Sequence, residues 1–416
     1  MIIGGQQLLF AIAGVITARL LGPADKGELA VLMLLATAGA TIAVCGIDVW
    51  LTRVIPTGRP GAIRVLRRQA VVIATAGSVV TGLVAAGAVW AGVLAGPDAI
   101  GTTALTVVQA LWLLALATAL GQSRMRHWGA GYLLDAALFL VLVVALLLAG
   151  RASVGLVLVA AAAAKVLGAL GTASWRQKPN DAGSVPYREA LRFGWPASLG
   201  NLLTLATYRL DVLVVAAVLG ARDVGLYVTA SAVSEALWLP ADAAALILLP
   251  HVSRHGQRED TARVCRLTVT FATALGIVVF ATGWWLIPII FGEDFTDARR
   301  ALGPLLVGAV ALGLWKLLVA DLAARDETKR RASSAAAGVV TMLGLDLLLV
   351  PHLGIFGAGV GAAIGYSVAS LLAMRRWCAV TGGRPMELLR LRSGDISKLR
   401  QAFRSSAPAP EPVAQP

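Results

Sequence analysis

The residues of this chain that could do chemistry stand inside apolar stretches, where polar side chains are costly. In one such stretch, Asn201, Thr204, Tyr208 and Asp211 recur at helical spacing, and Arg209 lies at the edge of their stripe. An ionisable side chain in an apolar span costs about 2.5–3.5 kcal/mol on insertion scales, so it normally faces a cavity or a partner. This stripe could therefore bind a charged or hydroxylated ligand inside a membrane.

Arg209 is the most informative of these residues. It stands eleven residues before Gly220, about 16 Å along a helix, which places it near the middle of a membrane. Asp211 is two positions away, and side chains so spaced do not face each other on a helix. Pairing with a residue of another helix is therefore the alternative to ligand binding.

Other ionisable residues also interrupt apolar stretches. Glu235 and Asp242 are seven apart, which puts them on one helix face. Lys165 and Lys316 each stand among apolar residues, although Lys316 could instead reach the membrane surface or pair with Asp321. We treat the two carboxylates and the two ammonium groups as candidate cavity residues.

Four further residues have an ordinary structural explanation. Asp48 and Arg53 near the end of the second stretch could cap or anchor it, and Asp135 and Asp346 are also as readily structural. The glycines of Gly357-Ala-Gly-Val-Gly361 sit in an apolar span, where they indicate close helix packing rather than a nucleotide-binding loop.

Composition identifies the elements that must position these side chains. The chain is 58% hydrophobic and only 14% charged, whereas a soluble chain carries roughly 25% charge, so it reads as an all-α polytopic membrane protein. Twelve apolar stretches are long enough to cross a bilayer as helices. They cover residues 2–20, 28–51, 69–95, 99–121, 130–149, 152–173, 194–219, 225–250, 267–290, 301–322, 333–350 and 354–374.

A repeated turn indicates that the chain is built of two related halves. The stretch Ala18-Arg-Leu-Leu-Gly-Pro-Ala-Asp-Lys-Gly27 matches Ala216-Ala-Val-Leu-Gly-Ala-Arg-Asp-Val-Gly225 at an offset of 198 positions. At this offset the two copies share a leucine, a glycine, an aspartate and a second glycine, which are Leu21, Gly22, Asp25 and Gly27 in the first copy. Each copy joins two apolar stretches. A duplicated helical unit follows, with two halves that could rock against each other.

The basic residues alternate along the chain. Most Lys and Arg lie in the even-numbered connections and the C-terminal tail, which predicts that these loops and both termini face the cytoplasm. Basic loops facing anionic lipid account for the net charge of +13, so no nucleic-acid partner is needed. The scattered Cys and His form no ligand set, and we expect neither a disulfide nor a metal site.

We expect four regions. An N-terminal six-helix bundle covers 1–175, and a cytoplasmic linker with a short surface helix covers 176–193. A C-terminal six-helix bundle covers 194–376, and a basic and then disordered cytoplasmic tail covers 377–416. No segment is large enough for a soluble catalytic domain.

Several motifs resemble one known family. They are Ala18-Arg-Leu-Leu-Gly-Pro with Gly27, Tyr208-Arg-Leu-Asp211 with the turn after it, Leu248-Leu-Pro250, and Gly354-Ile-Phe-Gly-Ala-Gly-Val-Gly-Ala362. Together they resemble the polysaccharide (oligosaccharidyl-lipid, Wzx-type) flippases of the multidrug/oligosaccharidyl-lipid/polysaccharide exporter superfamily, over residues 1–376. The resemblance implies a MATE-like fold, in which two six-helix bundles related by a pseudo-two-fold axis enclose a cavity that opens to alternate sides.

The family resemblance also implies a substrate and a site. Such flippases carry a polyprenyl-diphosphate-linked glycan through a cationic cavity, and arginine can bind a diphosphate bidentately. The expected head-group residues are Arg209, Arg53 and Lys316, with Arg19 and Lys165 as weaker candidates. Asn201 and Tyr208 could bind sugar hydroxyls, and Asp211, Glu235 and Asp242 could couple transport to ions.

The remaining expectations concern cofactors, partners and place. We expect no cofactor, and coupling to protons, to sodium ions or to the membrane potential. The expected partners are the glycan lipid, membrane lipids and polysaccharide assembly proteins, and the expected location is the bacterial plasma membrane.

Three other functions stay open at this point. A multidrug or other small-molecule exporter on the same scaffold would need an acidic, aromatic cavity. A glycan polymerase or ligase would need a large outer loop, whereas the longest one here is Phe291–Arg300. A scaffold that does not transport is not excluded by the sequence.

Overall fold

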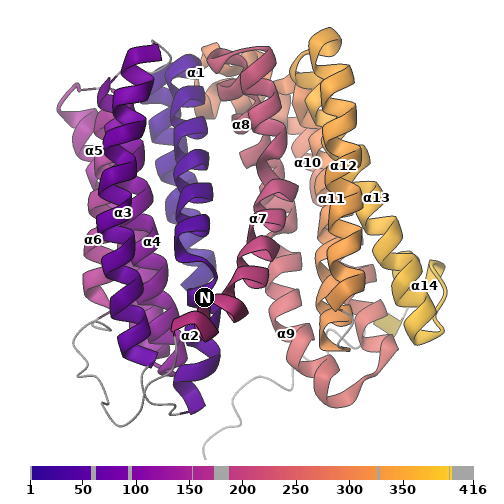
Figure 1. The fold of residues 1–416 in the computed structure, drawn as a ribbon. Helices are drawn as coiled ribbons and strands as arrows, with labels where there is room; N and C mark the ends of the chain where they lie inside the picture. The colour runs from indigo at the N-terminus through magenta and orange to yellow at the C-terminus, as the bar shows by residue number, and fades with distance from the viewer. Residues whose placement is uncertain are drawn as a thin grey trace, which may run out of the picture.

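The computed structural model describes residues 2–57, 62–91, 96–151, 153–172, 187–325, 328–392 and 394–395. Throughout this part of the chain the secondary structure is helical (Figure 1). The first half contains α1 (Ile2–Val44), α2 (Ile47–Val54), α3 (Ala62–Ala91), α4 (Gly96–Gly121), α5 (Met125–Leu148) and α6 (Val154–Gly171). The second half contains α7 (Tyr187–Val218), α8 (Ala221–Glu235), α9 (Leu239–His255), α10 (Arg258–Phe291), α11 (Arg299–Ala324), α12 (Thr328–Leu353), α13 (Ile355–Thr381) and α14 (Met386–Leu389).

The number of membrane spans depends on how α1 is counted. Among the described residues, ten helices are long and apolar enough to cross a membrane, and α1 is one of them. Its backbone leaves the helical conformation at Gly22, with φ 75° and ψ 176°, directly before Pro23. The helix rises from the N label to the upper end of the molecule, and the chain returns to α2 at the lower end (Figure 1). The predicted all-α membrane fold is confirmed, and the count of twelve stays a prediction.

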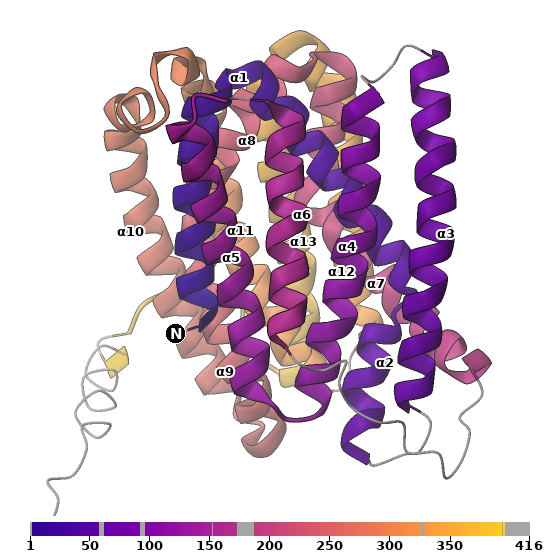
Figure 2. The same ribbon diagram turned by 90° about the vertical axis from the view of Figure 1, so that its left-hand side faces the viewer.

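The helices form two bundles. In Figure 1, α3–α6 stand on the left and α9–α13 on the right, with α1 and α7 between them. Figure 2, viewed from the side of the first half, has α3 at one edge and α10 at the other. The second bundle has one continuous apolar core, which includes Trp315, Tyr366 and Trp377. The first bundle has two smaller cores, around Phe139 and around Trp50.

Helix α7 belongs to both bundles. Residues 187–193, which we expected to form a separate surface helix, are continuous with the membrane-spanning part of α7. Ala190 is buried in the first bundle's core with Trp50, whereas Leu203 and Val212 pack in the core of the second bundle. Between these regions lies Pro196, which removes one backbone hydrogen bond and favours a bend.

Two close backbone contacts join the bundles at the upper end. A Cβ atom on Gly27 would lie 1.8 Å from the carbonyl oxygen of Ala221. A Cβ atom on Gly225 would lie 1.8 Å from the carbonyl oxygen of Pro23. The offset of 198 that relates the repeated turns also exchanges these two contacts. The repeated turns therefore pack on each other reciprocally, as a pseudo-two-fold axis requires.

Glycines also permit close packing within the second bundle, as the sequence predicted. A Cβ on Gly357 would lie 2.6 Å from the Leu349 carbonyl oxygen, and one on Gly361 would lie 2.0 Å from Asp346 Oδ1. The Gly357–Gly361 run is therefore a helix-packing motif.

The chain after α13 folds back onto α10. The guanidinium of Arg266 is fully buried and donates two hydrogen bonds of 2.7 Å to the carboxylate of Asp395. It donates two more to Glu259 Oε1 and to the carbonyl oxygen of Glu387, also at 2.7 Å. Part of the expected tail is thus ordered against the bundle. Residues 405–416, which we expected to be disordered, lie outside the described residues.

This contact predicts a pH-dependent stability. Hydrogen bonds from Arg266, with the charges of Arg266 and Arg263, lower the pKa of Asp395 to about 2, against about 3.9 in an unfolded chain. The stabilisation is present above about pH 4 and is lost as the pH falls towards 2. Asp395→Asn should lower the melting temperature of the purified protein at pH 7, and the difference from wild type should narrow below pH 4. An equal difference at pH 7 and pH 2.5 would contradict this account.

Candidate functional site

Two cavities lie where α7 meets its neighbours. The first has a volume of about 450 Å³ and combines residues of α7, α9 and α11 with Gln7 of α1. The second has a volume of about 330 Å³ and lies between the second half of α1, α7 and α8. Adjacent residues of α7 line different cavities, since Tyr208 faces the first and Arg209 the second. Helix α7 therefore separates two chambers between the bundles.

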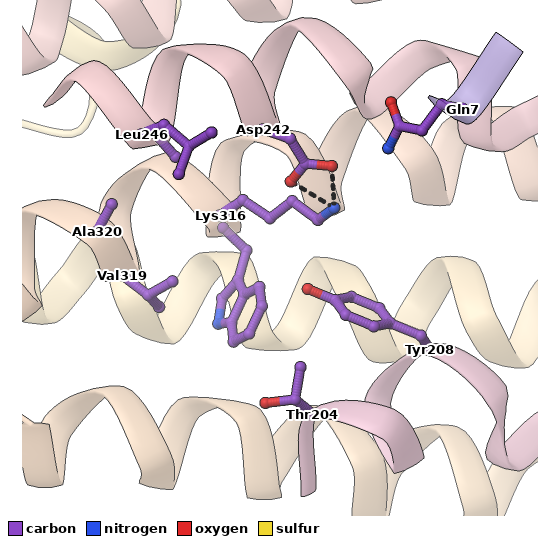
Figure 3. Close-up of a pocket in the computed structure, with 10 residues that line it drawn as sticks. Gln7, Thr204, Tyr208, Asp242, Leu246, Lys316, Val319 and Ala320 are labelled. Carbon is purple, nitrogen blue, oxygen red and sulfur yellow. Dashed lines mark hydrogen bonds and ion pairs between the residues drawn. The ribbon is translucent and has the colours of Figure 1, made fainter. Parts of the chain in front are cut away.

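The first cavity is organised around Lys316 (Figure 3). Its ammonium group donates hydrogen bonds of 2.7 and 2.9 Å to the two carboxylate oxygens of Asp242. The same group lies 4.4 Å from the ring centroid of Trp238 and 5.1 Å from that of Tyr208. The carboxylate and both ring faces attract the cation, so Lys316 is held inside the cavity rather than extended to a membrane surface. It does not pair with Asp321, which instead binds Arg325 at 2.6 Å.

The second cavity is organised around Arg209. Its guanidinium forms an ion pair of 2.8 Å with Glu235 at the end of α8. Lys26 of α1 lines the same cavity and donates a hydrogen bond of 2.7 Å to the hydroxyl of Thr17. The described lining of this cavity thus carries two cations and one carboxylate.

The two cavities together carry more positive than negative charge. Together they hold Lys26, Arg209 and Lys316 against Glu235 and Asp242, an excess of one positive charge. Both carboxylates are already engaged by a cation in this conformation. An anionic ligand could replace a carboxylate as the partner of either cation, because it forms the same charge-assisted hydrogen bonds.

A separate acidic cluster lies in the core of the second bundle. Asp211 is buried, receives a hydrogen bond from the hydroxyl of Tyr227, and accepts a second one of 2.8 Å from the backbone N–H of Val212. Asp346 is also fully buried, and neither of its carboxylate oxygens has a hydrogen-bond partner among the described residues. The two carboxylates are close enough to interact electrostatically. A buried carboxylate without a partner is costly unless it binds a proton or a cation.

The residues of the predicted polar stripe do not all lie in one site. Thr204 and Tyr208 of the predicted stripe face the first cavity, whereas Asp211 points into the core, and Asn201 is exposed and lines neither cavity. Glu235 and Asp242, expected on one helix face, line different cavities. A 3₁₀ turn at Ala236–Trp238 interrupts the helix between them.

Three predicted head-group residues lie elsewhere. Arg19 is exposed and donates to the carbonyl oxygens of Ile289 and of Ile290, the latter at 2.7 Å. Arg53 lies in α2 with its guanidinium 5.3 Å from the Phe193 ring. Lys165 forms an ion pair of 3.1 Å with Asp135 inside the first bundle. None of the three lines the two cavities, so their expected role in head-group binding has no geometric support in this conformation.

Two residues of interest were missed. Lys26 lies between the expected spans 2–20 and 28–51, but Lys26, Leu29, Ala30, Met33 and Thr37 have helical spacing and line one cavity. That spacing was the signal that could have placed Lys26 on a membrane-spanning face. The sequence offers a structural explanation for Asp346. No sequence signal distinguishes a carboxylate with a partner from one without.

Known proteins resemble this chain in both sequence and fold. The family described as "Polysaccharide biosynthesis protein" matches residues 131–300. A curated relative from Haloferax volcanii, "Probable low-salt glycan biosynthesis flippase Agl15", is 25% identical over 172 residues. The match covers 39% of this chain and 36% of that relative. The resemblance to the polysaccharide flippase family is confirmed.

Solved structures show the fold. The lipid II flippase MurJ in an inward closed conformation aligns with a TM-score of 0.73 at 12% identity, over 96% of this chain and 91% of its own. An inward-facing multidrug resistance MATE family transporter of the MOP superfamily gives 0.72 at 15% identity, over 91% and 94%. A multidrug resistance MATE family transporter of the MOP superfamily in an outward-facing conformation gives 0.62 at 16% identity, over 92% and 94%. This chain therefore shares the MATE-like membrane fold of these flippases and transporters.

Proposed function

We propose that this protein carries a polyprenyl-diphosphate-linked oligosaccharide, a precursor of a cell-surface polysaccharide, from the cytoplasmic to the outer leaflet by alternating access. The observation that carries the proposal is the pair of cation-bearing cavities between two bundles of a flippase fold. Lipid cannot solvate a diphosphate, whereas Arg209, Lys316 and Lys26 offer several charge-assisted donors. The polyprenyl tail can stay in the bilayer while the head group crosses.

The ion pairs give a means of releasing the substrate. A diphosphate that binds Arg209 or Lys316 frees Glu235 or Asp242, and a freed carboxylate inside a membrane favours uptake of a proton or a cation. Tyr208 and Thr204 line the first cavity and supply hydroxyl groups for the sugar. No cofactor takes part in this scheme.

Location and partners follow from the same proposal. We place the protein in a bacterial plasma membrane with both termini in the cytoplasm, because basic residues concentrate in the even-numbered connections and the tail. Its partners are the glycan lipid, the surrounding lipids and the polysaccharide assembly proteins that supply and use the precursor.

A deletion strain tests the function. Cells lacking the protein should accumulate a glycan linked to a polyprenyl diphosphate on the cytoplasmic side, identified by lipid extraction and mass spectrometry. Lectin labelling of intact spheroplasts should fail to detect this glycan at the outer surface until the gene is restored. Normal surface exposure of the glycan lipid in the deletion strain would end the proposal.

A small-molecule exporter is the second candidate, and the first cavity favours it. Trp315, Tyr208 and Asp242 form an aromatic and acidic lining there, which suits a cationic drug. Drug sensitivity of the deletion strain with unchanged glycan lipids would favour this candidate.

Asp346 is the residue that we propose for ion coupling together with Asp211. Asp346→Asn should leave the protein folded, because it removes a buried charge that has no partner. In proteoliposomes, transport driven by an imposed proton or sodium gradient should fall to the rate seen without a gradient. Asp294→Asn, which alters an exposed carboxylate near α11, is the matched control and should keep the gradient response. A gradient response that survives in Asp346→Asn would remove Asp346 from the coupling site.

A further inference from the structure

The lower ends of the two bundles differ in how their arginines are neutralised. In the second bundle, Arg266, Arg325 and Arg263 all pair with carboxylates. In the first bundle, the described segments at the same end contain two acidic residues, Asp48 and Glu189. Their basic residues are Arg53, Arg64, Arg67, Arg68, Arg124, Arg126, Arg188 and Arg192. The first bundle therefore carries an excess of positive charge at the end that we predict to be cytoplasmic.

The first turns of α7 organise part of this charge into a stripe. Arg188, Arg192, Trp195 and Leu199 are spaced i, i+4, i+7 and i+11, and all four are exposed. Ala190 on the opposite face is buried against the first bundle. The stripe runs about 16 Å along the helix, from two guanidinium groups through an indole to an aliphatic side chain.

This order of side chains matches the levels of one leaflet of a bilayer. Arginine suits the phosphate level of a bilayer, tryptophan the interface, and leucine the hydrocarbon. Trp195 is 52% exposed and Leu199 48%, so both are open to a lipid chain. A cavity of about 820 Å³, which is room for a head group, is lined by Arg188, Glu189, Leu191 and Arg192.

Two arginines of neighbouring helices flank the stripe and are already oriented. The guanidinium of Arg68 lies 4.4 Å from the Tyr187 ring centroid, and that of Arg53 lies 5.3 Å from the Phe193 ring centroid. Neither arginine has an ion-pair partner in the part of the chain that is described. Stacking engages the face of a guanidinium and leaves its in-plane N–H groups available to phosphate oxygens.

We infer that this stripe, with Arg53 and Arg68 beside it, is a binding site for an anionic phospholipid of the surrounding leaflet. The phosphate binds at Arg188 and Arg192, and one acyl chain lies along Trp195 and Leu199. A zwitterionic lipid carries no net charge, whereas an anionic lipid is attracted by the excess of arginines at this end, so the site prefers a net negative head group. This inference does not depend on what the two cavities transport.

Native mass spectrometry of the detergent-purified full-length protein tests the inference. At equal added concentrations, wild type should retain dioleoylphosphatidylglycerol over dioleoylphosphatidylcholine by about tenfold. Arg188→Gln with Arg192→Gln should abolish the preference, and Arg188→Lys with Arg192→Lys should restore it, because the lysines keep the charge. The control, Arg124→Gln with Arg126→Gln, removes the same charge at the same end and should keep the preference. Equal retention of the two lipids by wild type, or a preference that survives the double glutamine change, would overturn the site.

A competition arm separates the phospholipid from the transported lipid. Equimolar farnesyl diphosphate should leave the bound phosphatidylglycerol in place. Displacement by farnesyl diphosphate in wild type would assign the stripe to a substrate diphosphate and overturn the phospholipid assignment.

Discussion

Export of the glycan lipid is expected to fall about 100-fold when Arg209 is replaced by alanine, because a hydrogen bond between charged groups contributes about 1.5–3 kcal/mol. Arg209 lines the cavity between α1, α7 and α8 and forms a 2.8 Å ion pair with Glu235. Arg209→Lys keeps the charge but loses the bidentate geometry, so it should lie between wild type and alanine. The measurement is surface exposure of the glycan lipid in a deletion strain that expresses each variant at equal level.

Two controls separate ligand binding from a structural role. Arg222→Ala removes an exposed arginine at the start of α8, outside both cavities, and should export normally. If Arg209 only neutralised Glu235, then replacing both residues by alanine would restore export. We expect the double variant to stay inactive. Restored export in the double variant would mean that Arg209 is a structural partner and not a substrate ligand.

The second large effect is expected at the reciprocal glycine contact. Gly27→Ala places a methyl group 1.8 Å from the Ala221 carbonyl oxygen, where neither backbone can yield without moving a bundle. Overpacking of this kind costs about 1–3 kcal/mol, which would shift the balance between the closed and open upper ends by about 5- to 150-fold. The pseudo-two-fold relation predicts the same result for Gly225→Ala.

Spin labels can measure this shift. With the three native cysteines replaced, labels at Asp25→Cys and Arg222→Cys sit on the two exposed turns. The distribution of distances between the two spin labels should gain a longer component in Gly27→Ala than in wild type. Gly14→Ala is the matched control in the same helix, since no atom lies within 4 Å of its added Cβ, and it should match wild type. A distance distribution in Gly27→Ala that is identical to wild type would show that the contact does not limit closure.

The fold could be predicted because its signals repeat along the chain. Apolar stretches of membrane-spanning length, the alternation of basic loops and the repeated turn all point to the same architecture. The contact between Gly27 and Gly225 adds a spatial relation that the offset of 198 only implied. Local spacing could not place residue 187 on the first bundle, because the sequence does not say which core a helix end will join.

The site was harder to predict, because its chemistry depends on pairs from distant helices. The spacing of polar residues in the stretch 194–219 located Arg209 and Tyr208. The partners of Arg209 and Lys316, however, come from α8 and α9. Asp211 has the same periodicity as Tyr208, yet it lies in the core of the second bundle, where Tyr227 of α8 donates a hydrogen bond to it. Lys26 looked like a loop residue because the α1 break at Gly22 places the turn several residues earlier than hydropathy suggests.

The sharing of α7 has a consequence for how the molecule can be divided. Its first two turns complete the core around Trp50, and its remainder helps to build the core of the other half. A fragment that ends before residue 187 would lack Ala190 and leave the core around Trp50 incomplete, although it contains every helix of its own repeat. The two halves are therefore not interchangeable modules, because the first depends on a helix of the second.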